Sequence, residues 1–182
     1  VVFGQSFGGM VAMHYAARHP GGISKLILSS TAAQFRLDET MKMMRKLGGP
    51  RAADVACEFF SNPSKAAYET YGQVCLPLYS NPNVPAAGAF RDRAIERPEV
   101  AFHFFSDEMA QMDMRAEIAN ITCPTLVIGG AIDPVTPPIC SKAIADAIGD
   151  NARLRMFEGC GHGPHRDDPT GAEKIMRHFL AD

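Results

Sequence analysis

Short apolar runs and longer helix-like stretches alternate over two parts of this chain. The apolar runs are typical of buried strands and occupy residues 1–3, 25–29, 124–130 and 153–157. The stretches typical of helices occupy residues 9–17, 138–148 and 170–180. Strands that alternate with helices and carry near-continuous apolar runs predict an α/β fold, with a parallel sheet covered on both faces.

The pattern changes between the second and third strands, over about residues 32–120. This segment holds six of the ten methionines and many aromatic residues, with helix-like stretches at 39–47 and 52–60 and a polar loop at 80–83. A structureless loop of this length is implausible in a compact domain. We therefore predict a helical subdomain inserted above the sheet, residues 32–117, between core segments 1–31 and 118–182. Plain packing is the expected role of most of its methionines.

The first apolar run leads directly into Gly4-Gln5-Ser6-Phe7-Gly8 and then into a predicted helix. Strand, tight turn and helix around Gly-x-Ser-x-Gly form a nucleophile elbow, which lifts the serine from the end of the sheet. Small residues two before and two after Ser6 are expected to let strand and helix approach closely. The amide of Phe7 and the helix N-terminus are then placed to stabilise negative charge on an attacked carbonyl oxygen.

A serine nucleophile needs a base and a carboxylate that orients the base. In a parallel sheet these groups belong after the carboxyl ends of strands. Asp133 follows the third strand, and His162 lies in a glycine-rich loop after the fourth strand. The order Ser6, Asp133, His162 is the order of the α/β-hydrolase arrangement.

Each of these three residues also has an ordinary structural interpretation. Gly-x-Ser-x-Gly occurs by chance in turns, Asp133-Pro134 can open a turn and cap a helix, and His162 can be a surface loop residue. Their joint order and placement at strand ends favour catalysis. Among the other histidines, His165 is expected to be a solvated loop residue, whereas His103 is either packed or lines a pocket. The remaining three are assigned to helices or a helix end, namely His14, His19 and His178.

Composition narrows the classes of partner. Net charge is −2 with both signs interspersed, and no apolar stretch is long enough to span a bilayer, so neither nucleic acid nor a membrane is an expected partner. Five widely spaced cysteines without a Cys-x-x-Cys pair are interpreted as buried apolar residues in a cytoplasmic protein. No cluster has metal-ligand spacing, so we expect no metal and no cofactor.

At these residues the sequence resembles the α/β-hydrolase superfamily over essentially its whole length, and within it the proline iminopeptidase-like branch. The resemblance rests on the elbow at residues 1–9, the acid loop at 130–137 and the histidine loop at 159–164, together with residues 113–128, which are similar to the return from cap to core. These motifs are specific for the superfamily and much less so for the branch.

The resemblance implies Ser6 as nucleophile, His162 as general base and then acid, Asp133 as its orienting partner and Phe7 as donor of one oxyanion amide. It implies an aminopeptidase acting on a small-molecule or short-peptide substrate with a free N-terminus, which cap carboxylates would hold. Five acids are available in the insertion, although solvated surface acids are the default interpretation: Glu58, Glu69, Glu96, Asp107 and Glu108. The alternatives are a small-molecule esterase or lactonase, a binding module and an inactive fragment.

Relatives of this kind carry an upstream half, which includes the first strands of the sheet and a loop with the second oxyanion amide. The present sequence does not contain that half. The expected fold is therefore the C-terminal half of an α/β-hydrolase parallel sheet, with the missing N-terminal half of the same fold as partner. The strand at residues 1–3 would become an exposed apolar edge, which invites aggregation. Low turnover by this chain alone is expected.

Overall fold

The computed structural model describes residues 1–83, 95 and 97–182. Four parallel strands form one sheet in the order β1-β2-β3-β4. Their bounds are Val2–Gln5 for β1, Leu26–Ser29 for β2, Thr125–Gly130 for β3 and Ala152–Phe157 for β4. Each predicted strand is present, with ends displaced by one or two residues, and the predicted α/β fold is confirmed.

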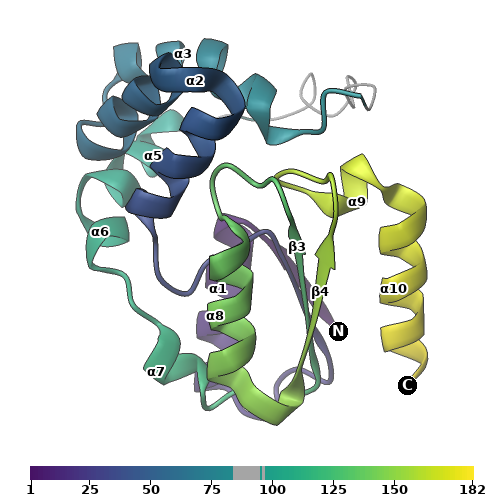
Figure 1. Ribbon diagram of the computed structural model, residues 1–182. Helices are drawn as coiled ribbons and strands as arrows, with labels where there is room; N and C mark the ends of the chain where they lie inside the picture. The colour runs from purple at the N-terminus through teal and green to yellow at the C-terminus, as the bar shows by residue number, and fades with distance from the viewer. Residues whose placement is uncertain (84–94, 96) are drawn as a thin grey trace.

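Helices cover both faces of the sheet (Figure 1). On one face lie α1 (Phe7–Arg18), the short α7 (Arg115–Ile118) and α8 (Pro138–Ile148). On the other face lies α10 (Pro169–Ala181), whose Phe179 packs against Ile27 and Ile128. The central strands β2 and β3 are fully buried, as their continuous apolar runs predict.

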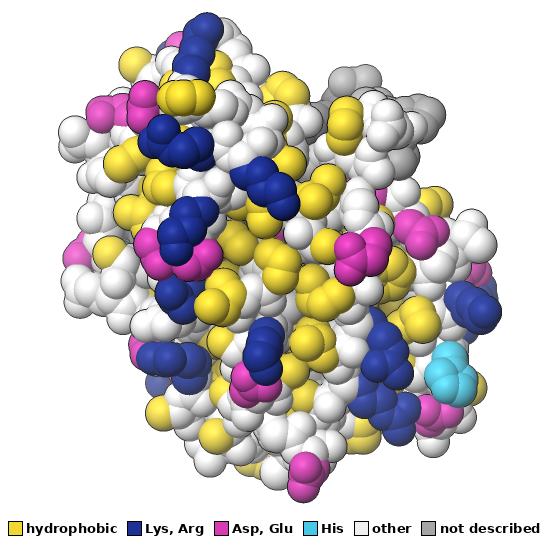
Figure 2. Space-filling view, in the orientation of Figure 1, with side chains coloured by type: hydrophobic (Ala, Val, Ile, Leu, Met, Phe, Trp, Pro, Cys, Tyr) yellow, Lys and Arg dark blue, Asp and Glu magenta, His cyan; other side chains and the backbone are white. Residues whose placement is uncertain are grey.

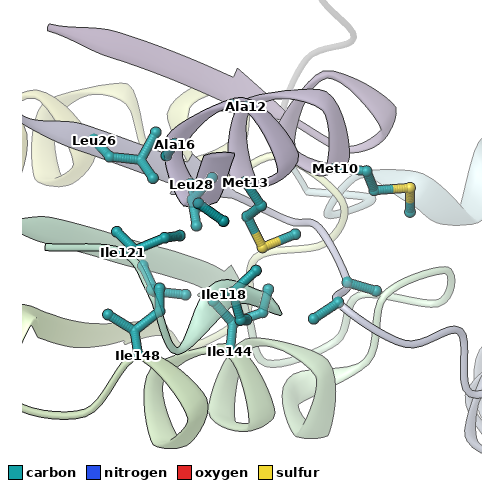
Figure 3. Packing of buried hydrophobic residues seen from close by; sticks show 14 of the residues in the cluster. Met10, Ala12, Met13, Ala16, Leu26, Leu28, Ile118, Ile121, Ile144 and Ile148 are labelled. Atoms are coloured by element: carbon teal, nitrogen blue, oxygen red, sulfur yellow. The ribbon is translucent and has the colours of Figure 1, made fainter. Parts of the chain in front are cut away.

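The main core lies between the sheet and the α1–α8 layer (Figure 3). Met13 from α1, Leu28 from β2 and Ile144 from α8 are all fully excluded from solvent and belong to the same cluster. Strand β4 is different, because its Arg153 and Arg155 are exposed at the far edge of the sheet. The core therefore fixes the positions of β1, β2 and β3, and with them the points at which the following loops begin.

The predicted insertion is helical and lies above the carboxyl ends of the strands (Figure 1). Its elements are α2 (Leu37–Ser61), α3 (Lys65–Val74), η1 (Leu76–Tyr79), α5 (Pro98–His103), η2 (Phe104–Glu108) and α6 (Met109–Gln111). A separate hydrophobic cluster holds these elements together, with Met44, Phe59, Tyr71 and Met109 at its centre. Met44 and Met109 confirm the packing role expected for methionines.

Residues 39–47 and 52–60, predicted as two helices, both belong to α2, which is kinked between them. Gly49 has non-helical backbone angles with φ 74°, and Pro50 follows it. A proline cannot donate to the preceding turn, so the helix changes direction here.

The two ends of the insertion are joined at its base. The Met114 amide donates to the Ala33 carbonyl at 2.8 Å, and Gln34 forms an isolated antiparallel bridge with Asp113. The Asp113 carboxylate also accepts from the Arg115 side chain at 2.8 Å. We call these residues, 33–34 and 113–115, the insertion clasp.

The remaining short elements flank β4. η3 (Gly149–Asn151) precedes this strand and α9 (Pro164–Asp167) follows it. All five cysteines are free, and Cys75, Cys140 and Cys160 are buried, whereas Cys57 is exposed. Within the residues that the structure describes, none of the helices has the length and apolarity needed to cross a membrane.

Candidate active site

Ser6 stands at the turn between β1 and α1 with φ 50° and ψ −124°, a backbone conformation that L-residues rarely adopt. Four described hydrogen bonds to its backbone hold it there, one of them from the Met10 amide to the Ser6 carbonyl at 3.3 Å. Its amide donates to the Ser29 carbonyl at 3.0 Å, and its carbonyl accepts from the Gly9 amide at 2.9 Å and from the Thr31 hydroxyl at 2.7 Å. Backbone strain of this kind costs on the order of 1 kcal/mol and persists only where surrounding contacts enforce it.

Gly4 and Gly8 were both predicted to allow close approach of strand and helix, and only Gly4 does so. A Cβ at Gly4 would lie 2.7 Å from the Gly8 carbonyl, so Gly4 does allow strand and helix to approach. A Cβ at Gly8 would meet nothing within 4 Å, and the prediction for Gly8 is therefore wrong. The close approach belongs instead to Gly9, whose added Cβ would lie 2.6 Å from Thr31.

Asp133 lies just beyond β3 and is completely buried. Its Oδ1 accepts from the Val135 and Thr136 amides at 2.8 and 2.9 Å, and its Oδ2 accepts from the Thr136 hydroxyl at 2.8 Å. Burial alone would raise the pKa of this carboxyl, but the adjacent His162 and the backbone donors outweigh burial and hold the pKa below 3.8. Asp133 is therefore an ionised acceptor.

His162 lies in the loop after β4 and is 4% exposed. Its Nδ1 is 2.9 Å from Asp133 Oδ2, and its Nε2 is 3.0 Å from Ser6 Oγ. An ionised Asp133 accepts the Nδ1 proton, which leaves Nε2 as the acceptor for the Ser6 hydroxyl. The structure thus brings together the three side chains that the sequence singled out.

The other histidines lie away from this arrangement. His165 is half-buried on α9 with its ring edge against Phe3 at 5.8 Å, and burial lowers its pKa, so the prediction of a solvated loop residue is wrong. His103 is exposed and lies 3.3 Å from Glu108, so of its two interpretations neither core packing nor pocket lining holds. His14 and His19 lie on α1 and at its end, and His178 on α10.

Phe7 is the first residue of α1, so its amide belongs to the helix N-terminus, where amides lack partners within the helix. Its ring is 47% exposed and stands edge-on to Phe104 with 5.0 Å between centroids. Phe104 comes from the insertion, so this contact joins the elbow to the layer above it. The predicted oxyanion role of the Phe7 amide stays a prediction.

A cavity of about 360 Å³ opens above Ser6, between the elbow and the insertion. Its walls are almost entirely apolar and include Met10, Phe35, Phe60, Phe104, Phe105 and Val135. In the view of Figure 2, hydrophobic side chains also gather on the surface where the insertion meets the helices below it. Apart from Ser6, the polar residues of the wall are Thr136, whose hydroxyl donates to Asp133, and Arg97.

The acids proposed as holders of a substrate ammonium group do not line this cavity. Four of them, namely Glu58, Glu69, Asp107 and Glu108, are exposed on the insertion, which confirms the default interpretation. Glu96 lies outside the described residues. Among the described residues no group of three or more His, Cys, Asp or Glu side chains could hold a metal ion.

The sequence profile described as "Serine aminopeptidase, S33" matches residues 1–169. The chain belongs to the S33 family of α/β hydrolases. Among curated S33-like relatives, "Proline iminopeptidase PfmaB" of Pestalotiopsis fici is 27% identical over 188 residues, which is 99% of this chain and 66% of that protein. A "Pimeloyl-[acyl-carrier protein] methyl ester esterase" of Chromobacterium violaceum is 30% identical over 173 residues, 90% of this chain and 63% of that protein.

Solved structures agree on the fold. The proline iminopeptidase of Mycobacterium smegmatis superimposes with a TM-score of 0.69 at 23% identity, covering 99% of this chain and 64% of that one. The present S33 chain thus spans about two thirds of the length of the proteins it matches. Its relatives include both peptidases and ester hydrolases.

Several residues of this S33 site were not found from the sequence. Thr31 and Thr136 each hold a site residue through a hydroxyl, and Arg97 is the single charged side chain in the described cavity wall. Thr136 could have been found, because an Asp that opens a turn commonly accepts from amides two and three residues later. Thr31 and Arg97 carry no such local signal, since both reach the site through the tertiary fold.

Proposed function

We propose that the protein is a serine hydrolase that cleaves carboxylic esters through an acyl-enzyme on Ser6. The observation that carries the proposal is the series of hydrogen bonds from Asp133 through His162 to Ser6 Oγ, at 2.9 and 3.0 Å, beneath an apolar cavity. Nothing about ligand binding alone requires these three groups in contact, so a binding module is disfavoured.

In the first half of the reaction Ser6 Oγ forms a bond to the ester carbonyl carbon while His162 Nε2 takes the hydroxyl proton. The buried Asp133 carboxylate stabilises the resulting imidazolium. The Phe7 amide and the N-terminus of α1 donate to the oxyanion. The bond to the alcohol then breaks, and the leaving alkoxide receives the proton from His162.

In the second half a water molecule attacks the acyl-enzyme. His162 Nε2 takes a proton from the water as the new bond forms, and returns it to Ser6 Oγ as the acyl–serine bond breaks. The products are a carboxylic acid and an alcohol, and Ser6 is regenerated. No oxidant, metal or cofactor enters these steps.

The cavity wall supports an ester over a peptide with a free N-terminus. An ammonium group in an apolar cavity needs a carboxylate partner to offset its desolvation. None of the described wall residues is acidic, and Arg97 adds a positive charge that disfavours an ammonium group further. An apolar acyl or alcohol group fits the wall without either cost.

Aminopeptidase activity is the second candidate, because "Proline iminopeptidase" is the name of several relatives. Aminoacyl-arylamides and short-chain aryl esters, assayed side by side, separate the two. We expect a higher kcat/KM on the esters. A preference for the arylamides, lost on neutralising one acid of the insertion, would instead establish the peptidase.

The first experiment is intact-mass analysis after treatment with a fluorophosphonate, with Ser6→Ala and His162→Ala as controls. We expect one adduct on the wild-type chain and none on either variant, because the adduct needs both nucleophile and base. A folded wild-type chain that gains no adduct would contradict the proposal for this chain.

Arg97 supplies a test of substrate charge. We expect Arg97→Gln to lower kcat/KM about 1.4-fold to fivefold for an aryl ester that carries a distal carboxylate, because an exposed charge contributes about 0.2–1 kcal/mol. A neutral ester of the same length should be unaffected. Arg51→Gln, an exposed α2 arginine outside the cavity wall, is the matched control. Equal effects of Arg97→Gln on both esters would remove Arg97 from substrate recognition.

A further inference from the structure

The loop that carries His162 is rich in glycine. Gly159 has φ 69° and Gly163 has φ 155°, so glycines in the left-handed region stand on both sides of the base. Glycine loses more conformational freedom on folding than any other residue. The position of His162 must therefore be fixed by contacts with other parts of the molecule.

Part of that fixation comes from the insertion. The His162 amide donates to the Tyr79 carbonyl at 2.6 Å, and the Tyr79 ring stands edge-on to the imidazole with 5.1 Å between centroids. A Cβ at Gly161 would lie 2.3 Å from the same carbonyl oxygen. The end of η1 therefore packs directly on the histidine loop.

Asp167 joins these two segments. It is the last residue of α9, five positions after His162, and is half-buried. One of its oxygens, Oδ2, accepts from the Gly161 amide at 2.7 Å and from the Asn81 amide at 3.0 Å. A single carboxylate oxygen thus connects α9, the residue before the base and the insertion.

Two further contacts act on the same loop from other sides. Gln5 Nε2 and the Arg166 guanidinium both donate to the His162 carbonyl. These groups hold the loop through the backbone of His162 itself. Among the described hydrogen bonds, Asn81 is connected to the loop through Asp167.

We propose that Asp167 is a positioning residue, which holds the insertion and the histidine loop in register so that His162 Nε2 stays within reach of Ser6 Oγ. The inference rests on the proposed function, because it presumes that His162 acts as the base. Tyr79 and Asn81 are not among the residues of the cavity wall, so we expect loss of this register to displace the base and to leave the wall in place. A misplacement of about 1 Å in such a site costs on the order of 100-fold in rate.

The test compares Asp167→Ala, Asp167→Asn and Asp168→Ala. Asp168 is the matched control, because its carboxylate caps α10 by accepting from the Gly171 amide at 2.9 Å, and no hydrogen bond among the described residues joins that carboxylate to the loop. For each variant the rate of Ser6 phosphonylation by a fluorophosphonate, kcat and KM on p-nitrophenyl butyrate, and Tm are measured.

We expect Asp167→Ala to lower the phosphonylation rate and kcat about 10-fold to 100-fold with KM nearly unchanged. Asp167→Asn keeps an acceptor oxygen and should stay within about threefold of the wild type. Asp168→Ala should lower Tm through loss of the cap and leave the phosphonylation rate unchanged. A merely structural role for Asp167 would instead make the rates follow Tm in both alanine variants.

Phosphonylation of Asp167→Ala at the wild-type rate would overturn the inference, as would an Asp167→Asn variant as slow as Asp167→Ala. If circular dichroism shows Asp167→Ala to be unfolded, Asp167→Glu decides, because it keeps the charge and moves the oxygen by one methylene. A reduced rate at unchanged KM supports the inference, and a wild-type rate overturns it. Failure of the wild-type chain to react at all would contradict the proposed function instead.

Discussion

Ser6 and Gly9 show how single residues make the elbow possible. Ser6 adopts a positive φ, and the turn it makes brings Gly9 of α1 directly against Thr31 after β2. Thr31 also donates its hydroxyl to the Ser6 carbonyl. Thr31 therefore stabilises the backbone conformation of Ser6 and also limits how closely α1 can approach the residues after β2.

Gly8 and Gly9 provide a matched pair for testing this. Gly9→Ala places a methyl group 2.6 Å from Thr31, so we expect a loss of about 1–3 kcal/mol in the free energy of unfolding and slower phosphonylation of Ser6. Gly8→Ala meets nothing within 4 Å and should raise stability by about 0.5–1 kcal/mol, because alanine favours a helix. Urea unfolding measures the free energy of unfolding of both variants. Equal stabilities would refute the assignment of the close approach to Gly9.

At this scale the sequence predicts the groups that react and misses the groups that hold them. Ser6, Asp133 and His162 were found because each follows a strand whose apolar run is visible, and parallel strands end at one edge. Thr31, Tyr79 and Asp167 act through tertiary contacts between segments far apart in the chain, and no local pattern marks them. The error at Gly8 has the same origin, since spacing alone cannot show which glycine faces a neighbour.

Whole elements were predicted more fully than residues. The strands and core helices carry strong apolar patterns, and their ends differ from the prediction by at most two residues. The insertion was predicted as helical, and its predicted stretches 39–47 and 52–60 correspond to the two helical parts of α2, which Gly49-Pro50 separates with a kink. How the insertion is fastened to the core was not predicted.

The insertion clasp contains an ion pair, Asp113 with Arg115, next to the bridge between Gln34 and Asp113. The Arg115 side chain and amide lower the pKa of Asp113 from 3.8 to about 2. A lowered folded-state pKa contributes stability above the unfolded pKa, and this contribution is lost as pH falls through the folded pKa. We therefore expect Asp113→Asn to be slightly less stable than the wild type at neutral pH, because the pair is exposed, with the difference shrinking below about pH 4.

Urea unfolding of both proteins between neutral pH and about pH 3 measures this convergence. Asp146→Asn on α8 is a control, because it removes an exposed ion pair, with Lys142, that lies outside the insertion clasp. A stability difference for Asp113→Asn that does not change with pH would argue against a contribution of the Asp113–Arg115 ion pair to stability.

At the scale of the whole molecule, the two edges of the sheet expose different kinds of side chain. β1 lies at an edge of the sheet, and its neighbourhood exposes Val1, Phe3, Val11 and Tyr15 by 46–68%. Unpaired strand edges with apolar side chains are templates for association with another chain. The opposite edge, β4, exposes Arg153 and Arg155 instead.

We expect this chain to self-associate with rising concentration, and Val1→Lys to reduce the association, because charge at an edge strand blocks pairing. Light scattering over a concentration series measures it. Leu180→Lys, an exposed apolar position at the end of α10, is the control for a general effect of added charge. Equal solubility gains from both variants would argue against association through β1.

The position of β1 also bears on the order in which the protein loses activity and structure. Among the described strands, β1 forms ladder hydrogen bonds with β2 alone, and the nucleophile is the residue directly after β1. Segments with fewer partners open at lower free energy than the core, so amide hydrogen exchange in β1 should be faster than in β2 and β3. Opening of β1 would withdraw Ser6 from His162 while the rest of the sheet stays intact. On heating, the reactivity of Ser6 should therefore fade several degrees before the circular dichroism signal does.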